Sequence, residues 1–271
     1  MDREELLYLS DLNLAESARE WARGSGGSIV EEAGSLLTAG PLAHPILNNA
    51  VRTEPSLDAG EFMRRTAEFY ARCGHGYSLT LAQHGQNSDL VKAAREAGLS
   101  SILRMPAMLV EAPLQQVPVP SGAELRRVVD ADGVEDFRKV AAEAWTTYGI
   151  PPEVTATVFS NDATLLAPHV IAVVSYIEAT PLCAALALLS HGIAGIYWVS
   201  SVSGARGRGL GEACTRVVTN AGFDLGARAV SLQASPMGDA IYRRMGYVEL
   251  SNYHMLWSPP PDPALTAKEG A

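Results

Sequence analysis

The sequence is short of cysteine, of paired histidines and of long apolar runs, and each shortage excludes a class of protein. Three separated cysteines among 271 residues cannot form a disulfide framework or a zinc cluster. The six histidines are scattered too, so no metal site is expected. No uninterrupted apolar run reaches the ~20 residues that cross a bilayer. The acidic start, residues 1–5, does not resemble a signal peptide, so we expect a cytoplasmic protein without a membrane partner.

Basic charge is also scarce. Twenty-one Lys and Arg residues face thirty Asp and Glu residues, which gives a net charge of −9. Both halves of the chain have this excess of acidic residues. Residues 1–120 carry 10 basic and 15 acidic side chains, and residues 121–271 carry 11 basic and 15 acidic ones. Without a basic arm, a nucleic-acid partner is disfavoured. The hydrophobic content of 47% instead predicts a folded chain, and its length allows two domains.

The first half of the chain, residues 1–112, is predicted to mix helices with strands, which is typical of α/β or α+β domains. Residues 113–122 follow, with three prolines and no helical period, and we interpret them as a linker between domains. An irregular loop inside one domain is the alternative. The expected helices of the first half are 12–21 (capped by Ser10 or Asp11), 57–73 and 87–97, and the expected strands are 29–30, 35–38, 46–51, 77–82 and 105–110.

The second half, residues 123–258, predicts one strand, a helix, a three-stranded meander, a helix, a strand, a helix and final strands. Ser235-Pro236 predicts the start of the last helix, with serine as its N-cap. The proline-rich and small polar end, residues 259–271, is expected to be disordered. The expected ranges are 124–129, 130–145, 170–177, 182–190, 193–199, 210–225, 229–234, 235–245 and 248–257.

A glycine-rich turn lies between the strand 193–199 and the helix 210–225. It comprises residues 206–211, and we call it the glycine turn. The first N–H groups of a helix have no intrahelical partner and carry partial positive charge. Such a turn can therefore hold a phosphate or pyrophosphate, although glycines also serve in plain turns.

Two motifs in the second half resemble those of the GNAT superfamily of acetyl-CoA-dependent N-acetyltransferases. Arg206-Gly-Arg-Gly-Leu-Gly211 is similar to the family's Arg/Gln-x-x-Gly-x-Gly/Ala motif. Residues 234–247 resemble its Ser/Asn…Tyr-x-x-x-Gly-Phe segment, with Tyr247 in the final position. The resemblance implies an α/β GNAT fold, with a central, mostly antiparallel twisted sheet flanked by helices, and acetyl-CoA as cosubstrate.

The first half resembles a degenerate copy of the same unit. Its strand 46–51 runs into a segment without Arg-x-x-Gly-x-Gly. The resemblance thus implies two tandem GNAT-like domains, an inactive one over 1–112 and a catalytic one over 123–258. An unrelated α/β domain in the first half is the alternative.

The resemblance also implies roles for individual residues. Tyr242 takes the position of the general acid that protonates the departing thiolate, with a packed aromatic as the alternative. Ser235 occupies a position where the family often has a CoA-contacting asparagine, although helix capping explains it equally well. The end of the strand, Val199, Ser200 and Ser201, would pair with pantetheine and present an amide to the thioester carbonyl. The pyrophosphate would be held by Arg206, Gly207, Arg208, Gly209, Leu210, Gly211 and Glu212.

The acceptor and the general base stay open at this point. Glu143 and Glu178 are candidate bases, and an ordered water or an amine of low pKa would also serve. The predicted acceptor is a small-molecule amine, with a protein amine as its nearest variant. The alternatives are a non-catalytic acyl-CoA sensor and a transferase using a longer acyl-CoA or an aminoacyl-tRNA. Monomer and homodimer are both possible. Candidates for the acceptor pocket, or for the core, are Trp145, Tyr148, Tyr197 and Trp198.

Overall fold

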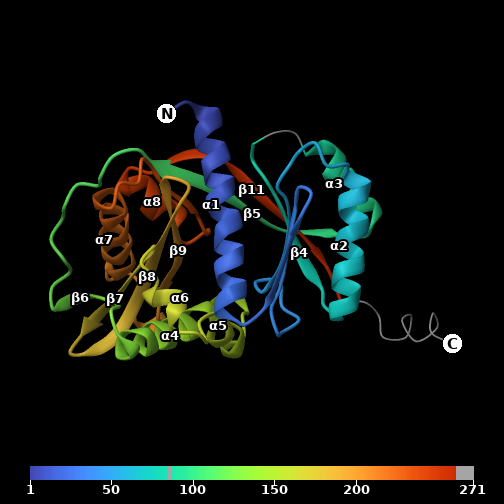
Figure 1. Cartoon of the computed structure of the whole chain (residues 1–271). Coiled ribbons are helices and arrows are strands. Elements are labelled where there is room, and N and C mark those ends of the chain that lie inside the picture. The colour runs from blue at the N-terminus through green and yellow to red at the C-terminus, as the bar shows by residue number, and fades with distance from the viewer. Residues whose placement is uncertain (85–86, 261–271) are drawn as a thin grey trace.

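The structure is a computed structural model that describes residues 1–84 and 87–260. Its described strands form one sheet in the order β1-β2-β3-β4-β11-β5-β10-β9-β8-β7-β6, with helices packed against it (Figure 1). The α/β fold with a large, mostly antiparallel sheet is thus confirmed, and β3–β4 and β9–β10 are its parallel pairs. The expected disordered tail lies, from residue 261 onward, outside the described residues.

The predicted elements occur in the expected order in both halves, and the described second half has four short helices that the sequence did not predict. The helices are α1 (Arg3–Gly24), α2 (Ala59–Cys73), α3 (Ser88–Glu96), α4 (Ala131–Trp145), η1 (Thr146–Tyr148), α5 (Pro152–Val158), α6 (Ala163–Leu166), η2 (Ser203–Ala205), α7 (Leu210–Asp224) and α8 (Asp239–Met245). The strands are β1 (Ser28–Glu32), β2 (Ser35–Ala39), β3 (Asn48–Arg52), β4 (Tyr77–Leu81), β5 (Ser100–Val110), β6 (Ala123–Arg127), β7 (Val170–Ile177), β8 (Thr180–Ser190), β9 (Ile193–Ser201), β10 (Val230–Gln233) and β11 (Val248–Ser258).

The two halves exchange their last strands. β5, from the first half, lies between β10 and β11, and it pairs antiparallel with both. β11, from the second half, lies between β5 and β4, and its Trp257 faces Ser78 of β4. The sheet therefore has no break at the boundary between the halves, and each half completes the sheet of the other. The assignment of domains at residues 112 and 123 stays a prediction.

The first helix is longer than the sequence suggested. α1 begins at Arg3, where Asp2 caps it by accepting from the Glu5 amide at 2.8 Å, and the predicted caps Ser10 and Asp11 lie inside the helix. That prediction was wrong because buried polar side chains interrupt the apolar period. Asp11 instead accepts hydrogen bonds from the backbone amides of Gln83 and His84, both at 2.7 Å.

α1 also connects the halves of the molecule. Asn13, fully buried, donates to the Leu188 carbonyl at 3.0 Å and accepts from the Tyr197 hydroxyl at 2.7 Å. Asp11, two residues earlier, accepts from Tyr253 on β11 at 2.8 Å. The helix runs down the middle of the molecule in Figure 1, between the two groups of strands. It is the longest described helix, yet neither it nor another described helix has the length and apolarity of a membrane span.

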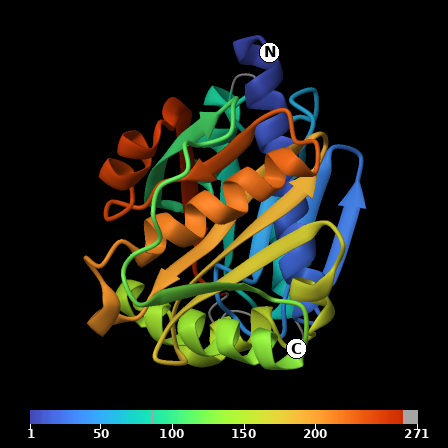
Figure 2. The ribbon, with the colours of Figure 1, turned by 90° about the vertical axis from the view of Figure 1, so that its left-hand side faces the viewer.

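In the second half, helices cover both sides of the meander. α7 packs on β7, β8 and β9, and α4 packs on the same strands (Figure 2). One stripe of α7 is buried, because Leu210, Cys214 and Val218 are at most 1% exposed. The main core cluster joins this stripe to α4, to the meander and to α8. This packing fixes the ends of β9 and α7 relative to each other.

The start of the last helix differs from the prediction. α8 begins at Asp239 and is preceded by Gly238, so Ser235 is not its N-cap. The Ser235 hydroxyl accepts from the Gly238 amide at 3.2 Å, and this bond closes a turn before the helix. Ser-Pro is equally compatible with such a turn, and sequence alone does not separate the two. The site residue Ser235 is therefore half-buried in a turn next to the end of β10.

Candidate functional site

The helix α7 starts without a side-chain cap. Its N-cap is Gly209, in the left-handed conformation with φ of 76°, and no side chain accepts from the first amides. Gly207 also has a positive φ, of 74°. Side chains with a Cβ rarely adopt this conformation, so the glycines give the turn its shape. The first N–H groups of α7 are consequently available to an anion.

The end of β9 extends beyond its pairing with β10. The register of β9 with β10 runs from Ala194 to Ile196, whereas β9 itself continues to Ser201. On its other side β9 stays paired with β8 as far as Cys183↔Ser201. Beyond Ile196, the described part of β9 thus has a strand on one side only. Val199 lies in this stretch and is half-buried.

The two arginines of the glycine turn have different surroundings. Both side chains are exposed. Arg206 donates from Nη2 to the Thr147 hydroxyl at 2.5 Å, which links the turn to the segment after α4. The sequence held no signal for Thr147. Glu212, in the first turn of α7, is paired with Arg216 at 2.7 Å, so its carboxylate is partly neutralised beside the open amides.

Tyr242 lies on α8 and is 8% exposed. Burial raises the pKa of its hydroxyl well above that of free tyrosine, and the neighbouring Cys183 and Tyr148 raise it further. The side chain of Thr215 on α7 offers it a hydrogen bond. The structure therefore brings the α8 tyrosine, the end of the meander and the first turns of α7 together. At neutral pH the phenol holds its proton and is available as a donor.

Two thiols lie beneath this arrangement. Cys183 and Cys214 are both 0% exposed, as expected for small buried residues. The Cys214 thiol donates to the Cys183 sulfur, which lowers the pKa of Cys183 and raises that of Cys214. The Ser201 hydroxyl also donates to Cys183, at 3.2 Å. Ser201 is thus turned toward β8.

The aromatic candidates separate into surface and core positions. Tyr148 is 46% exposed, and its ring lies 5.6 Å from that of Trp145. Trp198 is 6% exposed, and Tyr197 hydrogen-bonds to α1. Trp21 of α1 contacts both of these core rings edge-on. Only Trp145 and Tyr148 among the four candidates are therefore placed to border a ligand at the surface.

The two candidate bases are surface residues. Glu143 is an exposed residue of α4. Glu178 is exposed too, and it lies in the turn between β7 and β8 with a φ of 50°. No contact in the described structure ties either carboxylate to Tyr242 or to the end of β9. The base stays unassigned.

The segment 113–122 lies against α7. Asn220 accepts from the Leu114 amide at 2.7 Å and donates to the Leu114 carbonyl at 3.0 Å. Arg216 donates to the Gln115 carbonyl at 2.6 Å. Pro120 lies so close to Gly209 that an added Cβ there would meet its ring at 3.4 Å. The segment thus follows α7 back to the glycine turn.

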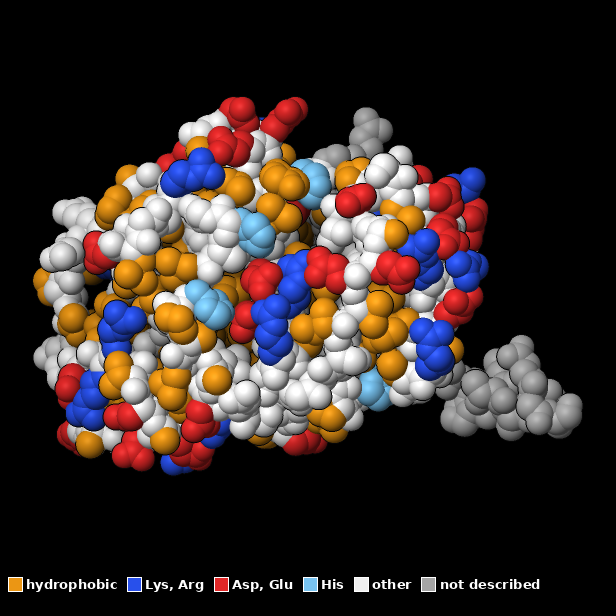
Figure 3. Space-filling view, viewed as in Figure 1, with side chains coloured by type: hydrophobic (Ala, Val, Ile, Leu, Met, Phe, Trp, Pro, Cys, Tyr) orange, Lys and Arg blue, Asp and Glu red, His pale blue; other side chains and the backbone are white. Residues whose placement is uncertain are grey.

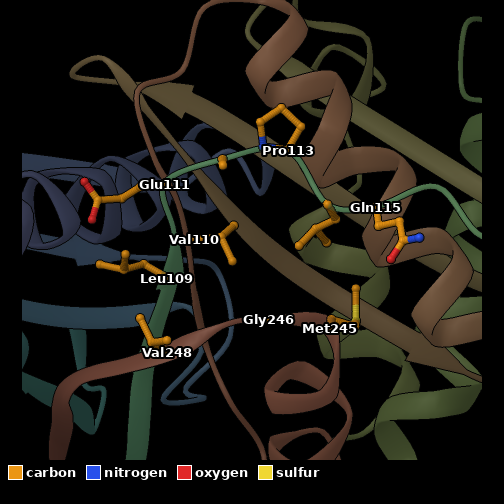
Figure 4. A pocket seen from close by; sticks show the side chains of 10 residues that line it. Leu109, Val110, Glu111, Pro113, Gln115, Met245, Gly246 and Val248 are labelled. Carbon is orange, nitrogen blue, oxygen red and sulfur yellow. The ribbon is translucent and has the colours of Figure 1, made fainter.

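A hollow of about 350 Å³ opens where β5 meets this segment and α8 ends (Figure 4). It is lined by none of the residues predicted for the site. Its one charged lining residue, Glu111, pairs with the Met1 amino group at 3.0 Å. The hollow therefore lacks the anion-binding groups that a CoA site requires. Its lining residues are Leu109, Val110, Glu111, Ala112, Pro113, Leu114, Gln115, Met245, Gly246 and Val248.

The surface on the side of α1 shows no patch of a single charge. Basic and acidic side chains are intermixed on this face in Figure 3. On α1, for example, Arg19 pairs with Glu16 at 2.9 Å and with Glu31 at 2.5 Å. This face offers no basic surface of the kind that follows a nucleic-acid backbone.

Comparisons with known proteins support the fold. No protein-family model and no curated protein sequence matches the chain. Among solved structures, it is similar to a GCN5-related N-acetyltransferase from Kribbella flavida, with a TM-score of 0.70 and 22% identity over 92% of this chain and 97% of that one. A GCN5-related N-acetyltransferase from Sphaerobacter thermophilus gives a TM-score of 0.62 at 14% identity, over 86% and 83% of the two chains.

A third similar structure is a tandem protein. It is a tandem GNAT protein from the clavulanic acid biosynthesis pathway, with a TM-score of 0.55 and 13% identity over 86% of this chain and 82% of that one. These likenesses extend over both halves of the chain. The predicted GNAT fold in a tandem arrangement is thereby confirmed, and at these identities the likeness concerns the fold.

Proposed function

We propose that the protein is an acyl-CoA-dependent N-acyltransferase, and specifically that it moves an acetyl group from acetyl-CoA to the amino group of a small molecule. One observation carries this proposal. The uncapped helix start at Gly209, the end of β9 beyond its register with β10, and the buried phenol of Tyr242 belong to three elements that meet at Cys183. These are the three elements that acyl transfer from a CoA thioester requires.

The pyrophosphate of the donor would be held by the backbone amides of residues 207–212. The helix start offers partial positive charge, and Arg206 and Arg208 add full charges at the surface. Arg206 uses one N–H of Nη2 on Thr147, and a guanidinium has further donors that can bind a phosphate. Ser201 points toward Cys183, so its contribution to the pantetheine would come from its backbone.

The reaction would proceed by direct attack of the amine. Its lone pair forms a bond to the thioester carbon, and the carbonyl oxygen gains a negative charge, which a fixed amide at Val199 would stabilise. The C–S bond then breaks and the sulfur leaves with its electron pair. Tyr242 would donate its proton to this sulfur, because a thiolate of pKa about 8.5 leaves more easily when protonated. The amine loses its proton to water or to a base still to be assigned.

The acceptor would enter beside Trp145 and Tyr148. These rings border the segment after α4, and both stay partly or largely accessible. Aromatic faces attract cations, and the chain as a whole is acidic, so a protonated amine is favoured in the encounter. A protein amine is the nearest variant of this acceptor.

A thiol-release assay tests the proposal. Purified protein with acetyl-CoA is screened against amino acids, polyamines, aminoglycosides and short peptides, and free thiol is measured. We expect release with at least one class, and binding of CoA by calorimetry. Binding of acetyl-CoA without thiol release across the panel would favour the non-catalytic sensor. If a longer acyl-CoA or an aminoacyl-tRNA bound more tightly than acetyl-CoA, that compound would replace acetyl-CoA as the proposed acyl donor.

A further inference from the structure

The strand β9 has a bulge at Trp198 and Val199. Its register places Ser200 opposite Ala184 and Tyr197 opposite Leu186, so two residues of β9 face the single residue between. Trp198 has a φ of 55°, in the left-handed region. This conformation is unfavourable for a residue with a Cβ. A bulge of this kind persists only where its surroundings fix it.

The position of Trp198 sets it apart from the other strained residues. Five non-glycine residues in the described ranges have a positive φ. Four of them are in the turns of β-hairpins, where positive φ is common, and Trp198 alone lies inside a strand. The four are Ala33, Glu178, Ala179 and His191. The strain at Trp198 therefore calls for a specific restraint.

That restraint is a chain of two hydrogen bonds. The indole Nε1 of Trp145 donates to the Ser200 hydroxyl at 2.9 Å, and this hydroxyl donates to the Trp198 carbonyl at 2.9 Å. The directions are fixed, because an indole N–H can only donate and a carbonyl can only accept. Ser200 is 2% exposed, so water does not compete freely for either bond.

We propose that Trp145 is a positioning residue for the oxyanion contact of the reaction, acting through Ser200 on the peptide that joins Trp198 to Val199. The inference rests on the proposed function. A trans peptide is planar, so its carbonyl and its N–H point in opposite directions. Holding the Trp198 carbonyl toward Ser200 therefore directs the Val199 N–H the opposite way. That amide is the donor that acyl transfer requires at the end of β9.

The chain offers a matched control for the indole. Trp145→Phe removes the N–H and keeps a ring beside Trp198, 4.6 Å away in the native protein. Trp21→Phe makes the same chemical change in the same aromatic cluster, with its ring 6.0 Å from Trp198. In the described structure the Trp21 indole makes no hydrogen bond. Loss of packing affects both variants, whereas loss of the restraint affects only the first.

The first measurement follows the Val199 amide by ¹⁵N–¹H NMR in the full chain without ligand. We expect its signal to shift or broaden in Trp145→Phe and in Ser200→Ala, and to stay in place in Trp21→Phe. An unmoved Val199 signal in Trp145→Phe would overturn the inference. This readout does not depend on activity, so it stands apart from failure of the proposed function, which would show as no binding of CoA or acetyl-CoA by the wild type.

The second measurement is kinetic. With acetyl-CoA and an amine identified by the screen, Trp145→Phe should lower kcat about tenfold and leave the Kd for CoA within about twofold, since a displaced donor weakens the transition state more than the ground state. Trp21→Phe should keep the wild-type kcat. Equal kcat losses in the two variants would overturn the inference and leave Trp145 a packing residue.

Discussion

The two halves contain the same local unit, a strand, a helix and a second strand parallel to the first, and they differ where the helix begins. In the first half, α2 is capped by Asp58, whose carboxylate accepts from the Glu61 amide at 2.9 Å. In the second half, α7 begins at Gly209 and has no side-chain cap. A carboxylate at a helix start satisfies the amides that an anion would use, and its charge repels a phosphate. One residue thus separates a closed helix start from an open one.

The strands that precede these helices, β3 and β9, also end differently. Arg52, at the end of β3, is 3% exposed and binds both carboxylate oxygens of Asp89 at 2.6 and 3.0 Å. This pair ties β3 to the start of α3. At the corresponding end of β9, the Ser201 hydroxyl donates to Cys183 of the neighbouring β8, and the register with β10 has already ended. In the first half a cap and an ion pair thus occupy the helix start and the strand end, and in the described second half neither is present.

The largest effect is expected from placing an aspartate at the start of α7, as Asp58 stands at the start of α2. Gly209→Asp should weaken CoA binding at least about 100-fold, because a carboxylate replaces the anion at the helix start. Gly209→Asn is the matched control, since asparagine has the same shape and tolerates positive φ but carries no charge. Calorimetry with CoA measures both. Equal losses in the two variants would show that strain, and not charge, separates the halves.

Removing the proposed acid should have the next largest effect. The helix α3 of the first half has no tyrosine, whereas α8 has Tyr242. Tyr242→Phe should lower kcat about 100-fold, within the range of general acid catalysis, with CoA affinity unchanged. Thiol release at saturating acetyl-CoA gives the rate. A variant that transfers acetyl at the wild-type rate would remove Tyr242 from the mechanism.

Breaking the ion pair between Arg52 and Asp89 should lower the stability of the fold and leave CoA binding unchanged. Asp89→Asn removes the charge of the carboxylate that pairs with the buried Arg52 guanidinium. We expect a loss of about 1–3 kcal/mol in the free energy of unfolding, less than for a fully buried pair because Asp89 is half exposed. Urea unfolding measures it. CoA affinity should not change, and a gain or loss of CoA binding would contradict the passive role of this half.

A smaller loss is expected at the cap of α2. Asp58→Ala removes the bond to the Glu61 amide and should cost about 1 kcal/mol of unfolding free energy. Urea unfolding again gives the value. The same variant should not create a second CoA site, and calorimetry should fit one site per chain. Two sites would mean that the Asp58 cap, and not the absence of the glycines, prevents the first half from binding CoA.

The smallest effect concerns pH. Burial raises the pKa of Tyr242, whereas the unfolded chain ionises it near pH 10. Its contribution to stability is therefore complete below about pH 10 and is lost as the pH rises above that value. At pH 10 the wild type should lose about 0.4 kcal/mol more, relative to pH 8, than Tyr242→Phe does. Urea unfolding at the two pH values tests this, and equal losses would contradict a buried, protonated phenol.

The sequence predicted the second half better than the first, for physical reasons. The meander, α7 and the glycine turn follow apolar periods and glycine positions that are local, so they were found. The extent of α1 was missed because Asp11 and Asn13 are buried by tertiary hydrogen bonds, which periodicity does not report. The links of Arg206 to Thr147 and of Trp145 to Ser200 depend on contacts across 59 and 55 positions of the chain. Local sequence patterns do not predict such pairs.

The exchange of last strands has a consequence for synthesis on the ribosome. β4 needs β11 as its neighbour, and β11 is made more than 160 residues later, as His254 opposite Leu81 illustrates. The first half therefore leaves the ribosome with an unfilled strand position, and an exposed strand edge is prone to pair with other chains. Such distant pairings also slow folding. We expect the last step of folding to be the entry of residues 248–258 between β4 and β5, which are synthesised much earlier.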